Sequence, residues 1–340
     1  MKKLALAVVG LLILTTLSFS VVKEDKAEVP QRKEMIRPPY LKEGDTVALV
    51  AISSRVDVSK MEKHRKAIDT LRSWGLHVKC APHLFSQEGG WFPADDSTRA
   101  SDLQSAIDDP TVRAVLFFRG GYGAMRTFDY LDFESFRKNP KWLAGYSDVT
   151  AVLYAMNRIG VESILGTMPG SFIEDPTVRD TSAASLHDAL FGTLKEIKTA
   201  PHKYNQKGEA TGRLIGGNLC LITSVIGTDV DEDMKNEPYI LFMEEVDESV
   251  YRVDRMLQTL YRAGYLARAK AIVIGHFTGA RQGQFKTNVY ETIHSYTKKL
   301  GVPVIFGFPS GHTEPNYSIY IGRNATVKVD ENGGVMTFEE

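Results

Sequence analysis

A serine at a predicted strand-to-helix turn is the first candidate for chemistry in this sequence. Ser147 follows the short apolar run Trp142–Ala144 and precedes the apolar-periodic stretch Val149–Met156. This order predicts a strand, a sharp turn and a helix, with the serine at the bend. Backbone N–H groups at a helix N-terminus can hold a developing oxyanion, so the pattern is typical of a serine nucleophile. An ordinary helix N-cap is the competing interpretation, since Ser and Asp are common caps.

A serine nucleophile needs a histidine base within hydrogen-bond reach. Among the eight histidines, His276 and His312 directly follow predicted strands. His276 continues the pattern of its strand and is compatible with a core position. His312 lies in a loop, residues 307–315, that glycine and proline bound and in which no regular strand accounts for a histidine. Position alone therefore favours His312 as the base.

The base in turn needs a group that orients it. Glu244 and Glu245 come directly after a predicted buried strand, Tyr239–Met243. Adjacent side chains at a strand end point in opposite directions, so only one of the two can face a cleft. A carboxylate beside the imidazole would fix its tautomer and stabilise the imidazolium. A solvated pair of glutamates in a loop is the alternative.

A glycine cluster follows another predicted strand, Ala114–Phe118. Gly120, Gly121 and Gly123 permit close backbone approach and positive φ angles. The cluster lacks the Lys-Ser/Thr pair of a phosphate-binding loop and the spacing of a dinucleotide-binding loop. A loop that donates an N–H to an oxyanion fits better. Metal-binding motifs are also missing from the sequence, which predicts neither a metal nor a cofactor.

The elements that position these residues alternate between strands and helices. The order strand, helix, strand predicts an α/β fold with a parallel sheet. Sites in such sheets form at the carboxyl ends of strands, where the glycine cluster and Ser147 are both placed. Besides the strands named above, the predicted elements of the first part are strands at Thr46–Ile52 and His77–Cys80 and helices at Lys60–Trp74 and Ser101–Asp108.

A polar stretch at residues 193–212 predicts a linker between two domains. The N-terminal domain is placed at 38–192 and a smaller α/β C-terminal domain at 213–330. Residues 316–340 alternate in the manner of short antiparallel strands. The other elements predicted beyond the linker are helices at Leu219–Ile226, Val250–Gly264 and Val289–Leu300 and strands at Ala271–Ile274 and Val302–Phe306.

The N-terminus has the pattern of a secretory signal peptide. Lys2 and Lys3 precede an apolar stretch, Leu4–Leu17, and small residues follow it at Ser18 and Ser20. The apolar stretch is shorter than the roughly 20 residues of a membrane-spanning helix. The prediction is therefore a signal peptide at 1–20, a flexible leader at 21–37, and a mature, exported, periplasmic protein without a stable membrane span.

Composition bounds the remaining function classes. The net charge of −1 argues against a nucleic-acid partner or a polybasic membrane patch.

Cys80 and Cys220 lie in apolar surroundings, where either a disulfide or two buried free thiols is compatible with an exported protein.

Together the motifs resemble the LD-carboxypeptidase family of serine peptidases, which includes murein tetrapeptide carboxypeptidases and microcin-immunity peptidases. The resemblance runs in order from Pro38 to Val329. Each motif is weak alone, and the set is highly specific. The matching segments are Phe118–Ala124, Asn139–Lys141, Gly145–Ala151, Gly216–Leu219, Leu241–Glu245, Tyr251–Leu257 and Gly307–His312.

The resemblance implies a catalytic triad at Ser147, Glu244 and His312. It selects His312 over His276 and Glu244 over Glu245. Family membership also implies a flavodoxin-like or amidotransferase-like N-terminal domain, a substrate cleft between the domains and a homodimer.

Further site residues follow from the same resemblance. The oxyanion donors would be the backbone N–H groups of Asp148 and Gly121. Arg119 and Tyr122 are the predicted substrate-binding residues, and Arg126 is a second candidate for the terminal carboxylate. Two other arginines, Arg252 and Arg255, are equally compatible with helix salt bridges.

The implied activity is cleavage of an L,D peptide bond, with release of the terminal D-alanine from murein tetrapeptides in peptidoglycan recycling. Two departures concern the substrate: Gly166–Pro169 stands where a His-Gly-Pro-like run is expected, and the family's recycling members are mostly cytoplasmic. Three alternatives remain at this point: an exported solute-binding protein, a peptidase acting on a peptide-nucleotide toxin, and an amidotransferase. The amidotransferase would need a cysteine at the turn, where neither Cys80 nor Cys220 is placed.

Overall fold

The structure is a computed structural model that describes residues 34–173, 175, 180–231 and 237–340. The predicted signal peptide and most of the predicted leader lie outside the described residues. At the end of that leader, Ile36 forms a β-bridge with Val161, and Arg37 Nε lies 3.2 Å from Glu162 Oε2. These last residues are therefore packed, in contrast to the flexible leader predicted through residue 37.

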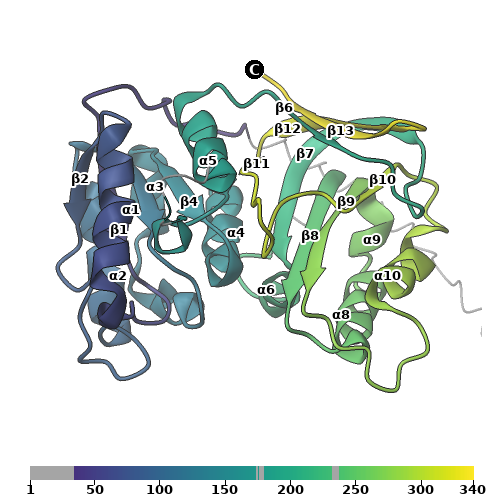
Figure 1. Ribbon diagram of the computed structural model, residues 1–340, viewed down its shortest axis with the longest axis horizontal. Helices are drawn as coiled ribbons and strands as arrows, with labels where there is room; N and C mark the ends of the chain where they lie inside the picture. The colour runs from purple at the N-terminus through teal and green to yellow at the C-terminus, as the bar shows by residue number, and fades with distance from the viewer. Residues whose placement is uncertain (1–33, 174, 176–179, 232–236) are drawn as a thin grey trace, which may run out of the picture. The chain divides into compact units, whose positions relative to one another are not determined.

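The first sheet contains six strands in the order β11-β5-β4-β3-β1-β2 (Figure 1). All neighbours pair in parallel except β11, which is antiparallel to β5. The parallel α/β class predicted for this part is confirmed. Its strands are β1 (Thr46–Val50), β2 (His77–Cys80), β3 (Val112–Phe117), β4 (Trp142–Gly145), β5 (Ser163–Leu165) and β11 (Ile319–Ile321), and its helices are α1 (Met61–Ser73), α2 (Asp96–Asp108), α3 (Phe133–Lys138), α4 (Thr150–Arg158) and α5 (Thr181–Phe191).

Helix α2 begins at Asp96, five residues before its predicted start at Ser101. The Asp95 carboxylate accepts a hydrogen bond from the Thr98 N–H at 2.7 Å and so caps the helix. An aspartate in this position satisfies an N–H group that would otherwise lack a partner in the first turn. The cap, rather than the apolar periodicity, sets the boundary.

The second sheet contains seven strands in the order β10-β9-β8-β7-β12-β13-β6. Strands β7 to β10 are parallel, and the remaining neighbours are antiparallel, as the alternation near the C-terminus predicts. The strands are β6 (Glu196–Thr199), β7 (Gly208–Asn218), β8 (Tyr239–Val246), β9 (Ala269–Thr278), β10 (Val304–Phe306), β12 (Asn324–Asp330) and β13 (Gly333–Phe338), and the helices are α6 (Leu219–Val225), α8 (Val250–Arg262), α9 (Tyr265–Arg268) and α10 (Val289–Thr297).

Two elements differ from the predicted domain boundaries. The stretch predicted as a linker, 193–212, contains β6 and the beginning of β7. Its polar character reflects an edge strand, since Ile197 is the buried member of β6. Strand β11 comes from the C-terminal part of the chain but pairs with β5 in the first sheet.

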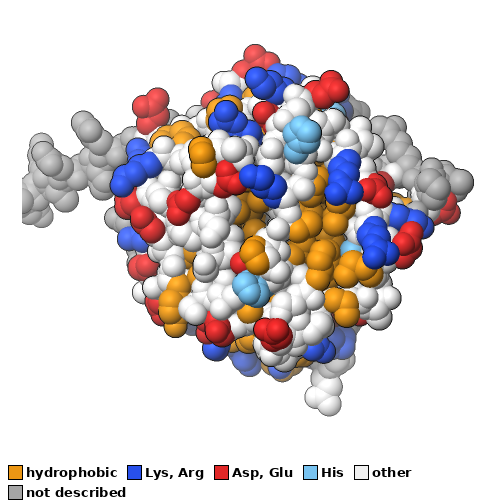
Figure 2. Space-filling view, turned by 90° about the vertical axis from the view of Figure 1, so that its left-hand side faces the viewer, with side chains coloured by type: hydrophobic (Ala, Val, Ile, Leu, Met, Phe, Trp, Pro, Cys, Tyr) orange, Lys and Arg blue, Asp and Glu red, His pale blue; other side chains and the backbone are white. Residues whose placement is uncertain are grey.

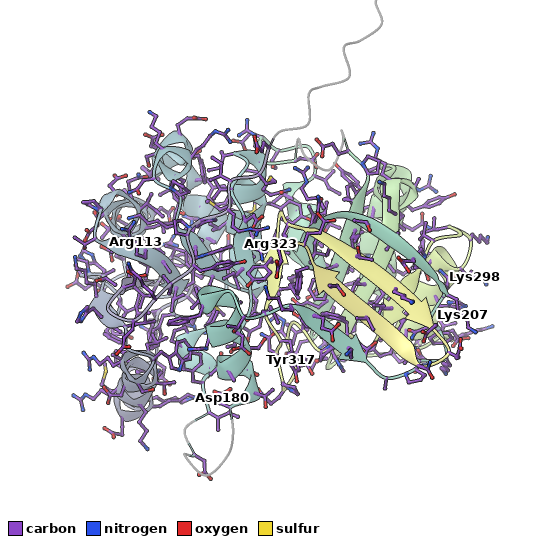
Figure 3. The ribbon with its side chains drawn as sticks, turned by 90° about the horizontal axis from the view of Figure 1, so that it is seen from above. Arg113, Asp180, Lys207, Lys298, Tyr317 and Arg323 are labelled. Carbon is purple, nitrogen blue, oxygen red and sulfur yellow. The ribbon has the colours of Figure 1, made fainter. Side chains whose placement is uncertain are left out.

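A buried arginine joins the two sheets where the chain passes from β11 to β12. Arg323 donates from Nε and Nη2 to Glu162 Oε2 at 2.9 and 2.6 Å, and from Nη1 to the Tyr40 hydroxyl at 2.9 Å. Its guanidinium lies 3.5 Å from the centre of the Tyr320 ring. Figure 3 shows Arg323 at this junction, with Lys207 and Lys298 at the far end of the second sheet.

The surface of the first half is polar and of mixed charge. Figure 2 shows Lys, Arg, Asp and Glu side chains interspersed on this face, around a group of hydrophobic side chains. Over the described residues, no helix is long and apolar enough to cross a membrane.

The cysteines do not form a disulfide. Both are free thiols, and Cys80 is exposed whereas Cys220 is partly buried. The expectation of two buried thiols is therefore wrong for Cys80. It lies on β2, an edge strand of the first sheet, with its side chain on the solvated side.

Candidate active site

Ser147 lies two residues after the end of β4, at the turn into α4, as the sequence predicts. Its backbone has a φ of 64°, in the left-handed region that non-glycine residues rarely adopt. Such strain persists only where the surroundings impose it, and it is frequent at functional sites. The neighbouring loop passes very close, because a Cβ placed on Gly120 would lie 3.0 Å from the Ser147 Cβ.

The structure brings Ser147, His312 and Glu244 into one hydrogen-bonded chain. His312 Nε2 lies 3.1 Å from the Ser147 Oγ, and His312 Nδ1 lies 2.8 Å from Glu244 Oε2. The same carboxylate oxygen accepts the backbone N–H of His312 at 3.0 Å. Because the carboxylate accepts, Nδ1 carries the ring proton and Nε2 is free to accept from the serine hydroxyl.

The two glutamates at the end of β8 face opposite sides of the strand, as the strand geometry predicts. Glu244 is fully buried beneath His312, and Glu245 is also buried. Glu245 accepts hydrogen bonds from Asn218 Nδ2 at 2.9 Å and from the Cys220 N–H at 2.8 Å. The alternative of a solvated loop pair is wrong, because β8 continues through both residues to Val246.

The charges around His312 raise the pKa of its imidazole. Burial of the imidazole lowers its pKa, but the hydrogen bond and the negative charge of Glu244 outweigh this effect. The more distant charges of Glu245 and Asp247 act in the same direction, so the pKa of His312 is raised above its ordinary value. An imidazole of this kind accepts a proton readily from a neighbouring hydroxyl.

Asp148 ties the nucleophile turn to the glycine cluster. Its Oδ2 accepts hydrogen bonds from the Ser53 hydroxyl at 2.6 Å and from the Ala124 N–H at 2.8 Å. The loop that contains Gly121 is thereby held beside Ser147. Within the described residues, the N–H groups of Asp148 and Gly121 donate no hydrogen bond to a carbonyl of the surrounding turns and loops. Their role as oxyanion donors stays a prediction.

A cavity of about 540 Å³ opens above Ser147 and His312. The first half of the chain contributes a wall that carries Lys60 and Arg119, and the second half contributes Val246 and Asp247. Tyr146 closes one side, with its ring centre 4.9 Å from that of His312. The other lining residues are Val56, Asp57, His64, Phe118, Gly120, Gly121, Met168, Gly170 and Ser171.

Of the predicted substrate-binding residues, Arg119 lines the cavity, whereas Tyr122 and Arg126 do not. Arg119 lines the cavity and donates from Nη1 to the Arg55 carbonyl at 2.7 Å. Tyr122 is exposed, lies outside the lining of this cavity, and packs against Phe92. Arg126 forms an ion pair with Asp96 at 2.8 Å and lines another pocket.

The two arginines of α8 also lie away from the cavity. Arg252 Nη1 is 3.5 Å from Glu248 Oε1, one turn earlier along the chain. The Arg255 guanidinium lies 5.4 Å from the centre of the Tyr251 ring. Both arginines therefore have the surface partners expected of helix residues.

His276, the other histidine considered as a base, lies on β9 and is absent from the lining of the cavity. Burial lowers its pKa. Met168, in the segment that departs from the expected His-Gly-Pro-like run, lies in the cavity wall. That segment therefore shapes the site with an apolar side chain.

Sequence reasoning missed Lys60, Tyr146 and Asp247 as cavity residues. Lys60 ends a short helical turn before α1, and Asp247 follows β8 in a loop. A wall assembled from separate loops has no periodic signal in the sequence. For Tyr146, its position directly before the nucleophile was the one available indication.

Comparison with known proteins identifies the family. A family model described as the LD-carboxypeptidase N-terminal domain matches residues 47–166, and one described as the C-terminal domain matches residues 211–327. The chain belongs to the LD-carboxypeptidase family. It is an enzyme, a serine-type LD-carboxypeptidase, as the resemblance of its motifs implies. The solute-binding alternative is thereby set aside.

Relatives of this LD-carboxypeptidase match it along almost their whole length. It is 32% identical to a probable murein peptide carboxypeptidase of Bacillus subtilis, over 88% of this chain and 94% of that protein. It is also similar to the solved muramoyltetrapeptide carboxypeptidase of Oxalobacter formigenes, with 27% identity, a TM-score of 0.78, and coverage of 87% and 99%. An MccF-like protein of Bacillus anthracis has a TM-score of 0.77 at 26% identity, with coverage of 90% and 100%.

Proposed function

We propose that this LD-carboxypeptidase releases the terminal D-alanine from murein tetrapeptides. The observation that carries the proposal is the hydrogen-bonded chain from Ser147 through His312 to Glu244, at the base of a cavity large enough for a peptide end. The substrate class, murein peptides, comes from the similarity to murein peptide and muramoyltetrapeptide carboxypeptidases, and its extension to this chain is part of the proposal.

In the acylation step, His312 Nε2 takes the proton of the Ser147 hydroxyl. The serine oxygen attacks the carbonyl carbon of the L-configured centre that precedes the D-alanine. When the tetrahedral intermediate collapses, the C–N bond breaks and His312 returns the proton to the departing amine. Deacylation repeats the sequence with water in place of the serine.

Glu244 holds the imidazole in the required tautomer during both steps. It also stabilises the imidazolium that forms transiently, because the carboxylate is buried and already hydrogen-bonded to His312. The oxyanion would be held by the N–H groups of Asp148 and Gly121. Each such donor is worth roughly 3 kcal/mol in the transition state.

A carboxypeptidase must also recognise the free carboxylate at the end of its substrate. Arg119 and Lys60 are the cationic side chains with suitable reach in the cavity wall. Arg126 is excluded from this role in our proposal, since Asp96 holds its guanidinium through two hydrogen bonds at 3.1 and 2.8 Å.

We further propose that the enzyme acts outside the cytoplasm, in the periplasm, as a homodimer. The N-terminal signal-peptide pattern supports export, and family resemblance supports dimerisation. Fractionation of cells that express the full chain, followed by light scattering of the mature protein, tests the two points separately.

The test of the reaction is incubation of the protein from residue 21 onward with a purified murein tetrapeptide, followed by mass spectrometry. We expect loss of one alanine, and no loss with the Ser147→Ala variant. Absence of cleavage by a folded wild-type protein would contradict the proposed substrate.

A second candidate function is cleavage of a peptide-nucleotide toxin. The observation that favours it is the similarity to the MccF-like structure. MccF is a microcin C7 self-immunity protein that has been solved with aspartyl sulfamoyl adenosine. The same assay, with an aminoacyl nucleotide analogue in place of the tetrapeptide, distinguishes the two. The murein proposal predicts a kcat/KM for the tetrapeptide that exceeds that for the nucleotide analogue.

A further inference from the structure

Asp247 shares an unusual backbone conformation with the nucleophile. Over the described residues, only Ser147 and Asp247 are non-glycine residues with positive φ, at 64° and 55°. Asp247 follows β8, three residues after Glu244, and lines the cavity together with Ser147 and His312. A strained residue at such a place is a candidate for a function that requires that conformation.

The surrounding backbone fixes this conformation. The Asp247 N–H donates to the Thr278 carbonyl at 2.8 Å, and the Thr278 hydroxyl donates to the His312 carbonyl. Gly279 leaves room for the carboxylate, because a Cβ at this glycine would lie 2.2 Å from Asp247 Oδ1. The conformation of Asp247 is therefore fixed by hydrogen bonds that connect the loop after β8 with the end of β9 and with the loop of His312.

The carboxylate itself is available to a ligand. It is solvent-exposed, and neither a hydrogen bond nor an ion pair is assigned to its oxygens within the described structure. By contrast, Asp57 on the opposite wall already accepts hydrogen bonds from the backbone and hydroxyl of Ser59. Asp247 is thus the unengaged anion on its side of the cavity.

Charges on the two walls are complementary to a zwitterionic substrate. The wall from the first half presents Lys60, Arg119 and Asp57 and so carries a net positive charge, with Asp57 Oδ2 3.9 Å from Lys60 Nζ. The wall from the second half presents Asp247. Ser147 lies in the same cavity. A peptide end with a carboxylate on one side of the scissile bond and an ammonium on the other would satisfy both walls.

We propose that Asp247 binds a side-chain ammonium group of the residue whose carbonyl is attacked, and so selects peptides in which that residue is a diamino acid. The inference rests on the proposed function and specifies its substrate class. Asp247 is in this role a specificity-determining residue that contacts the substrate.

The test compares two synthetic tetrapeptides that are identical except that the side-chain amine of the third residue is free in one and acetylated in the other. With the wild-type enzyme we expect kcat/KM to be roughly tenfold higher for the free amine, as a charge-assisted hydrogen bond provides. Asp247→Asn should abolish this preference, because it should raise KM for the free-amine peptide and leave KM for the acetylated peptide unchanged. Asparagine tolerates the left-handed conformation, so the variant should fold.

The ratio between the two peptides separates substrate binding from an effect on the base. Asp247 also contributes to the raised pKa of His312, and loss of its charge would change the rates on both peptides alike. Glu248→Gln is the matched control, because Glu248 is the next carboxylate along the chain and pairs with Arg252 outside the cavity. It should keep the wild-type preference.

Equal cleavage of both peptides by the wild type, or an unchanged preference in Asp247→Asn, would overturn the inference and leave the proposed function intact. Cleavage of neither peptide would overturn the proposed function, and the inference with it.

Discussion

At the scale of single residues, the geometry of the site depends on two hydrogen bonds that His312 donates to one oxygen of Glu244. Glu244 Oε2 receives both the Nδ1–H and the backbone N–H of His312, so the imidazole is fixed in position and tautomer. Gly311 allows this approach, because a Cβ there would lie 2.4 Å from the Glu244 Cγ. Removing one member of such a unit removes most of the function of the others.

Ser147→Ala and His312→Ala should each reduce kcat on a murein tetrapeptide by about 10⁴-fold or more while the fold persists. Ser147→Ala shortens a side chain at a cavity, so the free energy of unfolding should change little. His312→Ala leaves the buried Glu244 carboxylate without its Nδ1–H partner and should lower the free energy of unfolding by about 1–3 kcal/mol. Steady-state kinetics and thermal unfolding check the two parts. Substantial turnover in either variant would contradict the triad.

The pH profile of kcat/KM should report the raised pKa of His312. The imidazole must be neutral to accept the serine proton, so activity should fall as the pH drops through that raised pKa. Glu244→Gln removes the carboxylate charge that raises it. The acid limb should therefore move to lower pH, with a lower plateau because the tautomer is no longer fixed. An acid limb that stays in place would show that another group controls it.

At the scale of elements, a buried chain of hydrogen bonds links α4, the helix after Ser147, to β8, the strand that contains Glu244. The Asn218 N–H donates to Thr150 Oγ1 at 3.1 Å, and Asn218 Nδ2 donates to Glu245 Oε1 at 2.9 Å. Thr150 is the first residue of α4, and Asn218 caps α6 through the Leu221 N–H. The chain runs at the back of the site, away from the cavity.

Asn218→Ala should destabilise the protein by about 2 kcal/mol, through a lost helix cap and a lost hydrogen bond to the buried Glu245, whose Oε1 keeps the Val246 N–H as a donor. The backbone N–H of residue 218 still donates to Thr150 in this variant, so only the link to Glu245 on β8 is lost. The variant should also lower kcat more than it raises KM, because the position of β8 beside α4 sets the distance from Ser147 to His312. Denaturant unfolding and steady-state kinetics measure these effects. Thr223→Ala, which removes a hydroxyl bonded only within α6, is the matched control. An Asn218→Ala variant with unchanged kcat would remove this positioning role.

At the scale of the whole described structure, the site is built from residues of both sheets. Ser147 lies between β4 and α4 of the first sheet, Glu244 lies within β8 of the second sheet, and His312 lies in the connection from β10 to β11. Helix α5 also contributes, since the hydroxyls of Ser182 and Ser185 accept the N–H groups of Asn316 and Ser318 at 2.8 and 2.9 Å. These bonds anchor the chain that returns from the histidine loop toward β11.

The Arg323–Glu162 pair should be a main determinant of this junction. Arg323→Met leaves the buried Glu162 with Arg37, at 3.2 Å, as its remaining ion-pair partner and should cost about 3 kcal/mol in the free energy of unfolding. Combining it with Glu162→Met should recover much of the loss, because replacement of a whole buried pair by apolar side chains is tolerated. Denaturant unfolding of the two variants makes the comparison. A near-neutral single substitution would show that the junction does not depend on this pair.

The sequence allowed prediction of features that depend on local pattern. The turn at Ser147, the opposite orientations of Glu244 and Glu245, and the two-part α/β class follow from periodicity and strand geometry, and the structure shows each of them. The pairing of β11 with β5 was not predictable, since it depends on which sheet edge is open after folding. The same holds for Asp247, whose left-handed backbone is imposed by Thr278, about thirty residues away along the chain.

The most direct test of the central claim is covalent labelling of the protein from residue 21 onward with a serine-directed fluorophosphonate, followed by peptide mapping. A triad-activated nucleophile predicts stoichiometric modification at Ser147 alone, protection by murein tetrapeptide, and loss of labelling in the folded His312→Ala variant. Modification at another serine, or labelling that does not depend on His312, would contradict the account.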